Sequence, residues 1–284
     1  MDFHKTKLFA ESWNIAFRKR TDLDFPENLT SPFSIINNSF RYWAADPFLF
    51  EEDGEAYIFA ELYDYLKKRG VIGFCRINDI DKKWTPIIQE PYHLSFPFLY
   101  REAGNIYLMP ESSQSGQLYR YRAVHFPDHW EKDTVFFSDV RYVDTTPFTF
   151  RGERLALTYD LSNQSLRILN FTDGADSLAD TSSPEMKRPA GFINAQMCVR
   201  AAQNCQMDYG KGLIFYRFTV GEDLSFQEEE ICRVMPENLT LSESIYRDGL
   251  HTYQRSEHYE VIDIKTRRIN VLNLAIRILS KIHR

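Results

Sequence analysis

The sequence predicts an all-β fold, a five-bladed β-propeller, on three observations. Similar segments recur along the chain, each segment reads as short strands joined by glycine turns, and 43% of the residues are hydrophobic and 15% aromatic. Repeats of about 40–50 residues with three or four strands are typical of propeller blades, because one small sheet cannot bury both faces while a closed ring of sheets can. A β-sandwich with accidental self-similarity is the alternative.

Prolines mark the repeat. Residues 46–50 (DPFLF), 96–100 (FPFLY) and 146–150 (TPFTF) share one core, with prolines spaced 50 residues apart. Pro189 opens a fourth copy, and residues 249–263 contain a looser fifth. Fourteen residues after the proline, three copies carry a polar side chain at a shared position: Glu61, Glu111 and Gln203.

Each copy reads as a β-meander. An aromatic strand meets a polar turn with glycine, and a second strand follows. Third strands are expected at residues 71–77, 117–124, 165–171 and 212–218. Residues 13–18 are a candidate for an extra strand that closes the ring, and residues 172–187 read as a polar loop.

The propeller is expected to form a single domain over residues 1–265, followed by a short amphipathic helix over 266–284. This C-terminal segment is basic, and its apolar residues include Leu272, Leu279 and Ile282. Two interpretations remain open. The helix docks on the propeller, or it lies in a membrane interface, where its arginines suit anionic lipid.

The net charge and the absence of several known motifs argue against some classes of function. A net charge of −6 argues against a nucleic-acid partner, which selects basic surfaces. The first residues show no secretory signal and no apolar run is long enough to span a membrane, so we expect a cytoplasmic protein, with peripheral contact at the inner membrane through the C-terminal helix. No phosphate-binding loop and no metal-ligand spacing is found, so neither a cofactor nor a metal ion is expected.

Polar residues beside the repeat prolines are expected to converge on one end of the central channel. Two or three carboxylates around one pocket suit glycosyl chemistry, in which one acid protonates the leaving oxygen and another acts as base or nucleophile. We expect the catalytic residues to be Asp46, Glu111 and Asp144. The expected substrate-binding residues are Trp43, Glu61, His93, Arg188, Gln203, Tyr209 and His251.

Six of these residues also have a structural interpretation. Asp46 could cap a turn before its proline. Glu61 and Glu111 could form hydrogen bonds between blades, and Arg188 could pair with one of the acids. The two histidines, His93 and His251, could be satisfied structural groups.

Several motifs together resemble one family. They are residues 43–50 (WAADPFLF), 93–98 (HLSFPF) with 109–112 (MPES), 188–191 (RPAG) with 200–205 (RAAQNC), and 249–252 (GLHT). They resemble the propeller domain in the N-terminal half of plant glucosamine inositolphosphorylceramide transferases and its bacterial relatives, over about residues 43–263. The resemblance implies a propeller similar to family 43 glycoside hydrolases, in which an aspartate base, a pKa-tuning aspartate and a proton donor act together. Asp46 matches the base by its Asp-Pro motif, and Asp144 and Glu111 are candidates for the others.

The expected function is therefore that of a carbohydrate-active protein in the synthesis of cell-surface polysaccharide or glycolipid, acting by glycosyl transfer or hydrolysis on a sugar or glycolipid. A non-catalytic glycan-binding propeller that assists a partner glycosyltransferase is the alternative. A protein-interaction scaffold is a third class.

Overall fold

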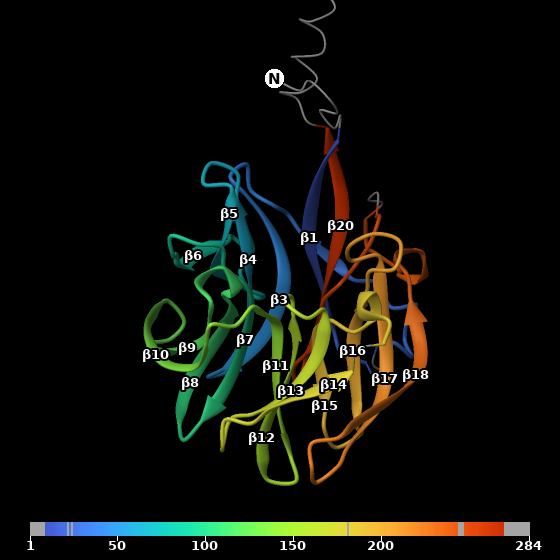
Figure 1. Cartoon of the computed structure of the whole chain (residues 1–284). Coiled ribbons are helices and arrows are strands. Elements are labelled where there is room, and N and C mark those ends of the chain that lie inside the picture. Colours follow the sequence, from blue (N-terminus) through green and yellow to red (C-terminus); the bar gives the residue numbers. More distant parts are fainter. Residues whose placement is uncertain (1–8, 22, 24, 181, 244–246, 270–284) are drawn as a thin grey trace, which may run out of the picture.

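A computed structural model describes residues 9–269, apart from positions 22, 24, 181 and 244–246. In this part of the chain, five four-stranded antiparallel sheets stand around a common axis (Figure 1). The innermost strands β3, β7, β11, β15 and β19 contact one another around that axis. The predicted five-bladed β-propeller is confirmed.

Blades 1 to 4 are meanders, in which the strand nearest the axis comes first in the sequence and the outermost strand comes last. Blade 1 contains β3 (Tyr42–Glu52), β4 (Glu55–Asp64), β5 (Arg69–Arg76) and β6 (Thr85–Ile88). Blade 2 contains β7 (Ser95–Glu102), β8 (Asn105–Glu111), β9 (Gln117–His125) and β10 (His129–Ser138). Blade 3 contains β11 (Tyr142–Phe150), β12 (Glu153–Asp160), β13 (Ser165–Asn170) and β14 (Asp176–Asp180). Blade 4 contains β15 (Pro189–Asn194), β16 (Val199–Asn204), β17 (Gly212–Val220) and β18 (Phe226–Val234).

Blade 5 is built from both ends of the described chain. It contains β19 (Tyr253–Arg255), β20 (Tyr259–Ile269), β1 (Phe9–Lys19) and β2 (Ser34–Ile36). β1 pairs antiparallel with β20 along its whole length, from Phe9 opposite Ile269 to Lys19 opposite Tyr259. Residues 13–18 thus supply the strand that closes the ring, as expected.

A buried ion pair reinforces this closure. The Arg18 guanidinium on β1 donates to the Glu260 carboxylate on β20 at 2.7 Å, and both side chains are almost fully buried. The second oxygen of Glu260 accepts bonds from the Tyr253 hydroxyl and the Phe25 amide, each at 2.7 Å. The ion pair between Arg18 and Glu260 requires that β1 and β20 pair in this register, and breaking it would leave a buried charge without a partner.

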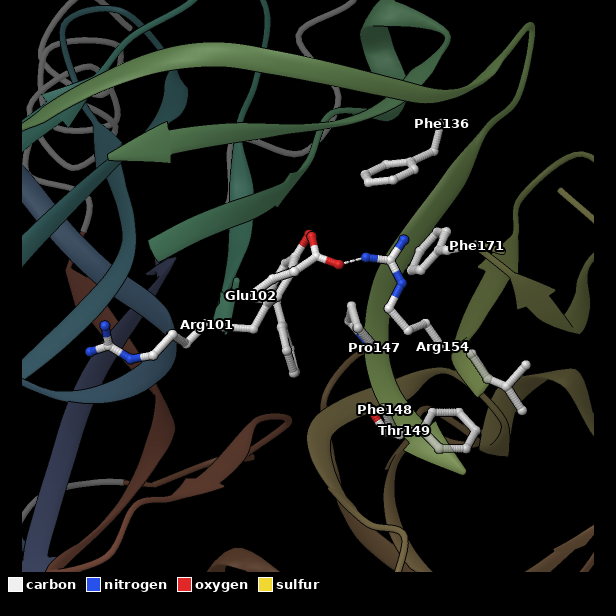
Figure 2. A pocket seen from close by; sticks show the side chains of 11 residues that line it. Arg101, Glu102, Phe136, Pro147, Phe148, Thr149, Arg154 and Phe171 are labelled. Carbon is white, nitrogen blue, oxygen red and sulfur yellow. Dashed lines mark ion pairs between the residues drawn. The ribbon is translucent and has the colours of Figure 1, made fainter. Parts of the chain in front are cut away.

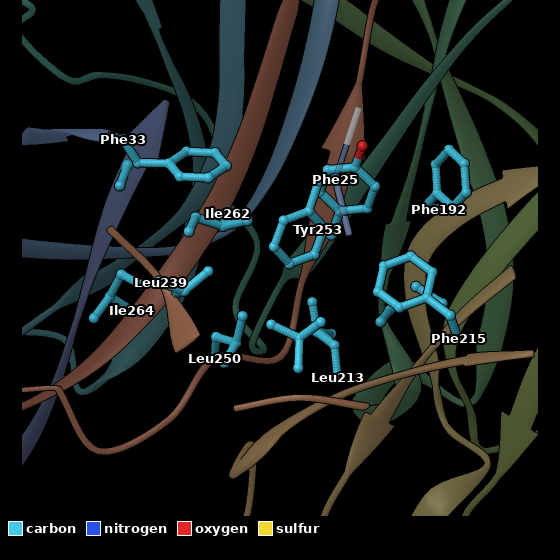
Figure 3. Close-up of a cluster of buried hydrophobic side chains, with 14 residues drawn as sticks. Phe25, Phe33, Phe192, Leu213, Phe215, Leu239, Leu250, Tyr253, Ile262 and Ile264 are labelled. Atoms are coloured by element: carbon cyan, nitrogen blue, oxygen red, sulfur yellow. The ribbon is translucent and has the colours of Figure 1, made fainter. Parts of the chain in front are cut away.

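Aromatic side chains fill the space between blades. Figure 3 shows one such cluster, in which Phe25, Phe192, Phe215 and Tyr253 meet between blades 4 and 5. The ring centroids of Phe25 and Tyr253 are 4.7 Å apart. Burial of one such ring stabilises the fold by about 1.5–3 kcal/mol, so contacts of this kind between sheets hold the ring of blades together.

The innermost strands share an irregularity at their first residues. The pairing of β3 with β4, β7 with β8 and β11 with β12 skips two residues on the inner strand. One residue of each bulge has a left-handed backbone, namely Asp46, Phe96 or Asp144, with φ of 49°, 46° and 54°. Bulges redirect side chains and are frequent beside active sites.

Two expectations about secondary structure need correction. Residues 172–187 are not only a polar loop, because they contain the outer strand β14 and the short 3-10 helix η2 (Pro184–Met186). Residues 266–269 continue β20 instead of opening a helix, since they pair with β1. The rest of the expected C-terminal helix lies outside the described residues. Within the described part, no helix is long and apolar enough to cross a bilayer.

Candidate functional site

The polar site lies where the innermost strands begin. β3, β7, β11 and β15 all enter the blade from one end, which also holds the first residues of β1 and the last residues of β20 (Figure 1). We call this the entrance end. Asp46, Asp144 and Arg188 lie at the start of their blades here, as the repeat predicted.

A second layer of polar residues comes from the second strand of each blade. Glu61 and Glu111 lie opposite Ala45 and Ser95, the residues just before the bulges. The amide of Gln203 donates to the Arg188 carbonyl, and the amide of Asp263 donates to the Thr252 carbonyl. The equivalent positions in the five blades are therefore Glu61, Glu111, Tyr159, Gln203 and Asp263.

Asp263 was not identified from sequence. Its blade lacks the repeat proline, so the spacing that selected Glu61, Glu111 and Gln203 could not be applied. The signal that was present is the polar residue inside an otherwise apolar strand, VIDI, at residues 261–264.

His251 lies between two aspartates. Its Nδ1 is 2.6 Å from Asp263 and its Nε2 is 3.6 Å from Asp46. Asp263 also accepts the amides of His251 and Thr252, at 2.8 and 3.0 Å, and Asp46 accepts the Thr252 hydroxyl at 2.8 Å. Burial lowers the pKa of His251, but the charges of Asp263 and Asp46 outweigh burial and raise it. We expect an imidazolium that bridges two carboxylates.

The carboxylate of Asp144 binds two side chains of blade 4, one of which is positively charged. Its Oδ2 accepts Nε of Arg188 at 2.6 Å and Nε2 of Gln203 at 2.9 Å. Asp144 is buried, whereas the Arg188 side chain is one-fifth exposed. Arg188 is thus held by an acid of the site, and its guanidinium faces the ring of Tyr209 at 5.3 Å.

Glu111 is the acid best suited to exchange a proton near neutrality. Its carboxylate accepts the hydroxyls of Ser95 and Ser113, each at 3.0 Å. Burial and the charge of Asp144 raise its pKa to about 7. Burial also raises the pKa of Asp46 to about 6, with further contributions from Asp263 and Asp144 that His251 opposes.

Glu61 has one carboxylate oxygen, Oε1, that is buried without a hydrogen-bond partner. Nε2 of His93 lies 3.5 Å from that oxygen, and Nδ1 of His93 accepts the Gly70 amide at 2.9 Å. This assigns the proton of a neutral His93 to Nε2, facing Glu61. Burial lowers the pKa of His93, and burial with the charge of Asp46 raises that of Glu61 well above its usual value.

A pocket of about 590 Å³ opens at the entrance end, and of the acids described above only Glu61 lines it. Its walls are mostly aromatic, and two charged side chains, Glu11 and Lys68, stand at the rim. The lining residues are Glu11, Trp13, Trp43, Glu61, Tyr63, Tyr65, Lys68, His93 and Tyr209. The rings of Trp43 and Tyr63 stack at 4.8 Å, and those of Trp13 and His251 at 4.0 Å.

All ten predicted site residues lie at this end of the channel. Six of them are joined to a neighbour by a side-chain hydrogen bond or a close ion pair, namely Asp46, Glu111, Asp144, Arg188, Gln203 and His251. The other four, Trp43, Glu61, His93 and Tyr209, line the pocket. Sequence reasoning missed Asp263, Thr252 and the pocket residues Glu11, Trp13, Tyr63, Tyr65 and Lys68.

Among the described residues, one group of side chains has the geometry to hold a cation. Ligand atoms of Asp46, His251 and Asp263 all lie within 4.8 Å of one another. A cation there would compete with the bond between His251 and Asp263, because Nδ1 cannot donate to a carboxylate and bind a metal at once.

A second pocket lies at the opposite end of the propeller, between blades 2 and 3. It measures about 170 Å³, and an ion pair between Glu102 and Arg154 crosses it beside the rings of Phe136 and Phe171 (Figure 2). None of the predicted site residues lines this pocket.

Known proteins resemble this chain in sequence. A family model described as the N-terminal part of glucosamine inositolphosphorylceramide transferase 1 matches residues 29–170. Glucosamine inositolphosphorylceramide transferase 1 from Arabidopsis thaliana is 29% identical over 242 residues, which cover 76% of this chain and 30% of the plant protein. The protein of that name from Oryza sativa subsp. indica is 31% identical over 113 residues, 39% of this chain and 15% of its own length. The chain thus spans less than a third of these relatives.

Solved structures share the fold at low sequence identity. A family 43 β-xylosidase/α-arabinofuranosidase from a compost microbial metagenome matches with a TM-score of 0.52 and 12% identity, covering 81% of this chain and 91% of that one. An α-L-arabinofuranosidase from Lactobacillus brevis matches with a TM-score of 0.51 and 11% identity, covering 77% and 81%. These similarities support the propeller architecture.

Proposed function

Because the chain belongs to the family of N-terminal domains of glucosamine inositolphosphorylceramide transferase 1, we propose that its entrance pocket binds a sugar and catalyses glycosyl transfer or hydrolysis. The observation that carries the proposal is a pair of buried acids with raised pKa values, Asp46 and Glu111, at the same end of the propeller as an aromatic pocket. Glycoside hydrolysis typically uses such a pair of carboxyl groups.

The two acids can act as proton donor and proton acceptor. A group with a pKa of about 7 is protonated in a useful fraction at neutral pH, so Glu111 can donate a proton to the leaving oxygen. Asp46, with a pKa of about 6, is mostly ionised and can accept the proton of the attacking hydroxyl, from water or from an acceptor sugar. Asp144 stays paired with Arg188 and acts through its charge, which raises the pKa of Glu111.

The pocket walls suit a pyranose or furanose ring. Trp43 and Tyr63 present stacked aromatic faces, and sugar C–H groups pack on such faces. The unpaired oxygen of Glu61 and the Nε2 proton of His93 supply an acceptor and a donor for sugar hydroxyls. These side chains together can hold a sugar ring at the entrance end.

The test is turnover in matched variants. Wild-type protein, Asp46→Asn and Glu111→Gln are assayed with a panel of sugar nucleotides and nitrophenyl glycosides, and binding is followed by calorimetry. We expect each amide variant to lose at least a hundredfold in turnover while it still binds the sugar. Trp43→Ala should instead weaken binding. Full turnover in both amide variants would end the proposal.

A glycan-binding role without chemistry is favoured by one observation. Most of the acids are already engaged, since Asp144 is held by Arg188 and Gln203, and Glu111 by two serines. In that case the pocket would present a glycan to a partner glycosyltransferase. Binding without turnover on any substrate, and unchanged binding in Glu111→Gln, would identify this role.

A further inference from the structure

Two adjacent loops at the entrance end of blade 1 carry exposed apolar side chains. The first loop, residues 37–41, connects β2 to β3 and carries Phe40, which is fully exposed. The second, residues 65–68, connects β4 to β5 and carries Leu66, which is 79% exposed. We call them the blade-1 entrance loops, and in Figure 1 they lie together at the top beside β5.

The loops are held together as one rigid corner. The amide of Tyr65 donates to the Arg41 carbonyl at 3.1 Å. Beneath them, the buried carboxylate of Asp64 accepts the amides of Leu66 and Lys67 and the guanidinium of Arg41, at 2.8–3.2 Å. Because the backbone is fixed from below, the side chains of Phe40 and Leu66 project outward from a preformed surface.

The charge around these apolar tips is positive. Residues 37–42 (NNSFRY) and 65–70 (YLKKRG) contain four cationic side chains and no acid. Lys67 and Lys68 are exposed, and Arg41 is paired but half exposed. This clustering is notable in a chain whose net charge is −6.

Other exposed apolar groups favour the same end. Four large hydrophobic side chains of the described residues are more than three-quarters exposed, and three of them lie at the entrance end: Phe40, Leu66 and Met207. The fourth, Ile80, is on the opposite end, in the loop after β5. The segment 270–284, which follows β20 at the entrance end, is basic, rich in leucine and isoleucine, and free of acids in sequence.

We propose that the blade-1 entrance loops dock the propeller on an anionic lipid bilayer. Apolar side chains between lysines and arginines are the composition that inserts into the headgroup boundary, because the rings and aliphatic chains enter while the cations contact lipid phosphate. A protein partner would be expected to bury a wider and less basic face.

Docking through the blade-1 entrance loops would place the mouth of the entrance pocket next to the lipid headgroups. Lys68 belongs both to the loop and to the pocket rim, next to Tyr65 and Tyr63. A sugar attached to a lipid could therefore reach the acids while its lipid remains in the bilayer. This extension to a lipid-linked substrate rests on the proposed function, whereas the docking itself does not.

The test is sedimentation of the full chain with vesicles of phosphatidylcholine, with and without about 30% phosphatidylserine. We expect binding that requires the anionic lipid, and a loss of at least tenfold in Phe40→Ser/Leu66→Ser. Ile80→Ser is the matched control and should bind as the wild type does. Lys67→Gln, which removes one positive charge, should bind about fivefold more weakly, and Lys83→Gln, at the opposite end, should bind as the wild type does. Circular dichroism confirms that every variant is folded.

Insertion is read separately from a Phe40→Trp variant, whose added fluorescence should be quenched by brominated acyl chains, whereas that of Ile80→Trp should not. No binding by the wild type, or undiminished binding by Phe40→Ser/Leu66→Ser, overturns the proposal; the latter would assign binding to another segment. Glu111→Gln should bind vesicles normally, so failure of the proposed chemistry and failure of docking are distinguishable.

Discussion

Asp46 and Asp144 hold the same place in blades 1 and 3, each as the left-handed residue of the bulge that opens the innermost strand. The bulge turns both carboxylates toward the axis, close enough for the charge of Asp144 to raise the pKa of Asp46. The bulge thus holds an acid in both blades, and what distinguishes blade 1 from blade 3 is the partner of that acid. Asp46 is met by His251 and Thr252, and Asp144 by Arg188.

The pair between Asp144 and Arg188 should control stability as well as charge. Asp144→Asn removes the only negative charge in hydrogen-bond contact with Arg188 among the described residues. An unpaired, largely buried guanidinium costs about 3 kcal/mol, so urea unfolding should show a loss of that order. The double variant Asp144→Asn/Arg188→Met should recover most of the loss. A double variant no more stable than the single one would mean that the pair is not what Asp144 contributes.

Ring closure should depend on Glu260. In Glu260→Gln the buried Arg18 loses its counter-charge, and the seam between β1 and β20 should weaken by about 3 kcal/mol. Glu230→Gln is the matched control, because the pair of Glu230 with Arg233 is exposed and should contribute less than about 1 kcal/mol. Chemical denaturation of the two variants gives the comparison, and equal stabilities would contradict a structural role for the seam.

The repeat prolines predicted the propeller and most of the site because a blade position fixes a side chain's direction. The proline register was misleading in blade 3, where it aligned Asp46 with Thr146. The bulge of that blade instead falls at Asp144, two residues earlier. A one-residue bulge changes which side chain faces the axis, and proline spacing does not report where a bulge lies.

Other features of the structure left no recognisable pattern in the sequence. β14 forms the outer edge of blade 3, and none of its side chains is fully buried, so its sequence DSLAD lacks the alternation of a half-buried strand. Asp263 lies in a blade assembled from both chain ends, where the repeat spacing is interrupted. The aromatic pocket depends on Trp13 from β1 meeting Tyr209 from a blade-4 loop, a contact between residues nearly 200 positions apart.

The raised pKa of Glu111 predicts a pH dependence of stability. Its value of about 7 in the folded protein lies above the ordinary 4.5, so the folded state binds more protons between these two pH values. The stabilisation is complete below pH 4.5 and is lost as the pH rises through 7. Glu111→Gln mimics the protonated form and should be more stable than wild type at pH 8, on the order of 3 kcal/mol, and similar at pH 4.5. Thermal unfolding at both pH values measures this, with Glu55→Gln at the exposed start of β4 as control. Equal stabilities of Glu111→Gln and wild type at pH 8 would show that Glu111 is ionised without cost.

The aspartates on either side of His251 should keep its imidazole protonated near neutral pH. Asp263→Asn leaves an oxygen for the amides of His251 and Thr252 but removes the charge 2.6 Å from Nδ1. The pKa of His251 should therefore fall, because only the charges of Asp46 and Asp144 then oppose the effect of burial. Proton NMR titration of the histidines reads this directly. Glu51→Gln serves as the control, since it should lower the pKa of the exposed His258 and leave His251 unchanged. If the His251 resonance titrates alike in Asp263→Asn and wild type, Asp263 does not set the charge of His251.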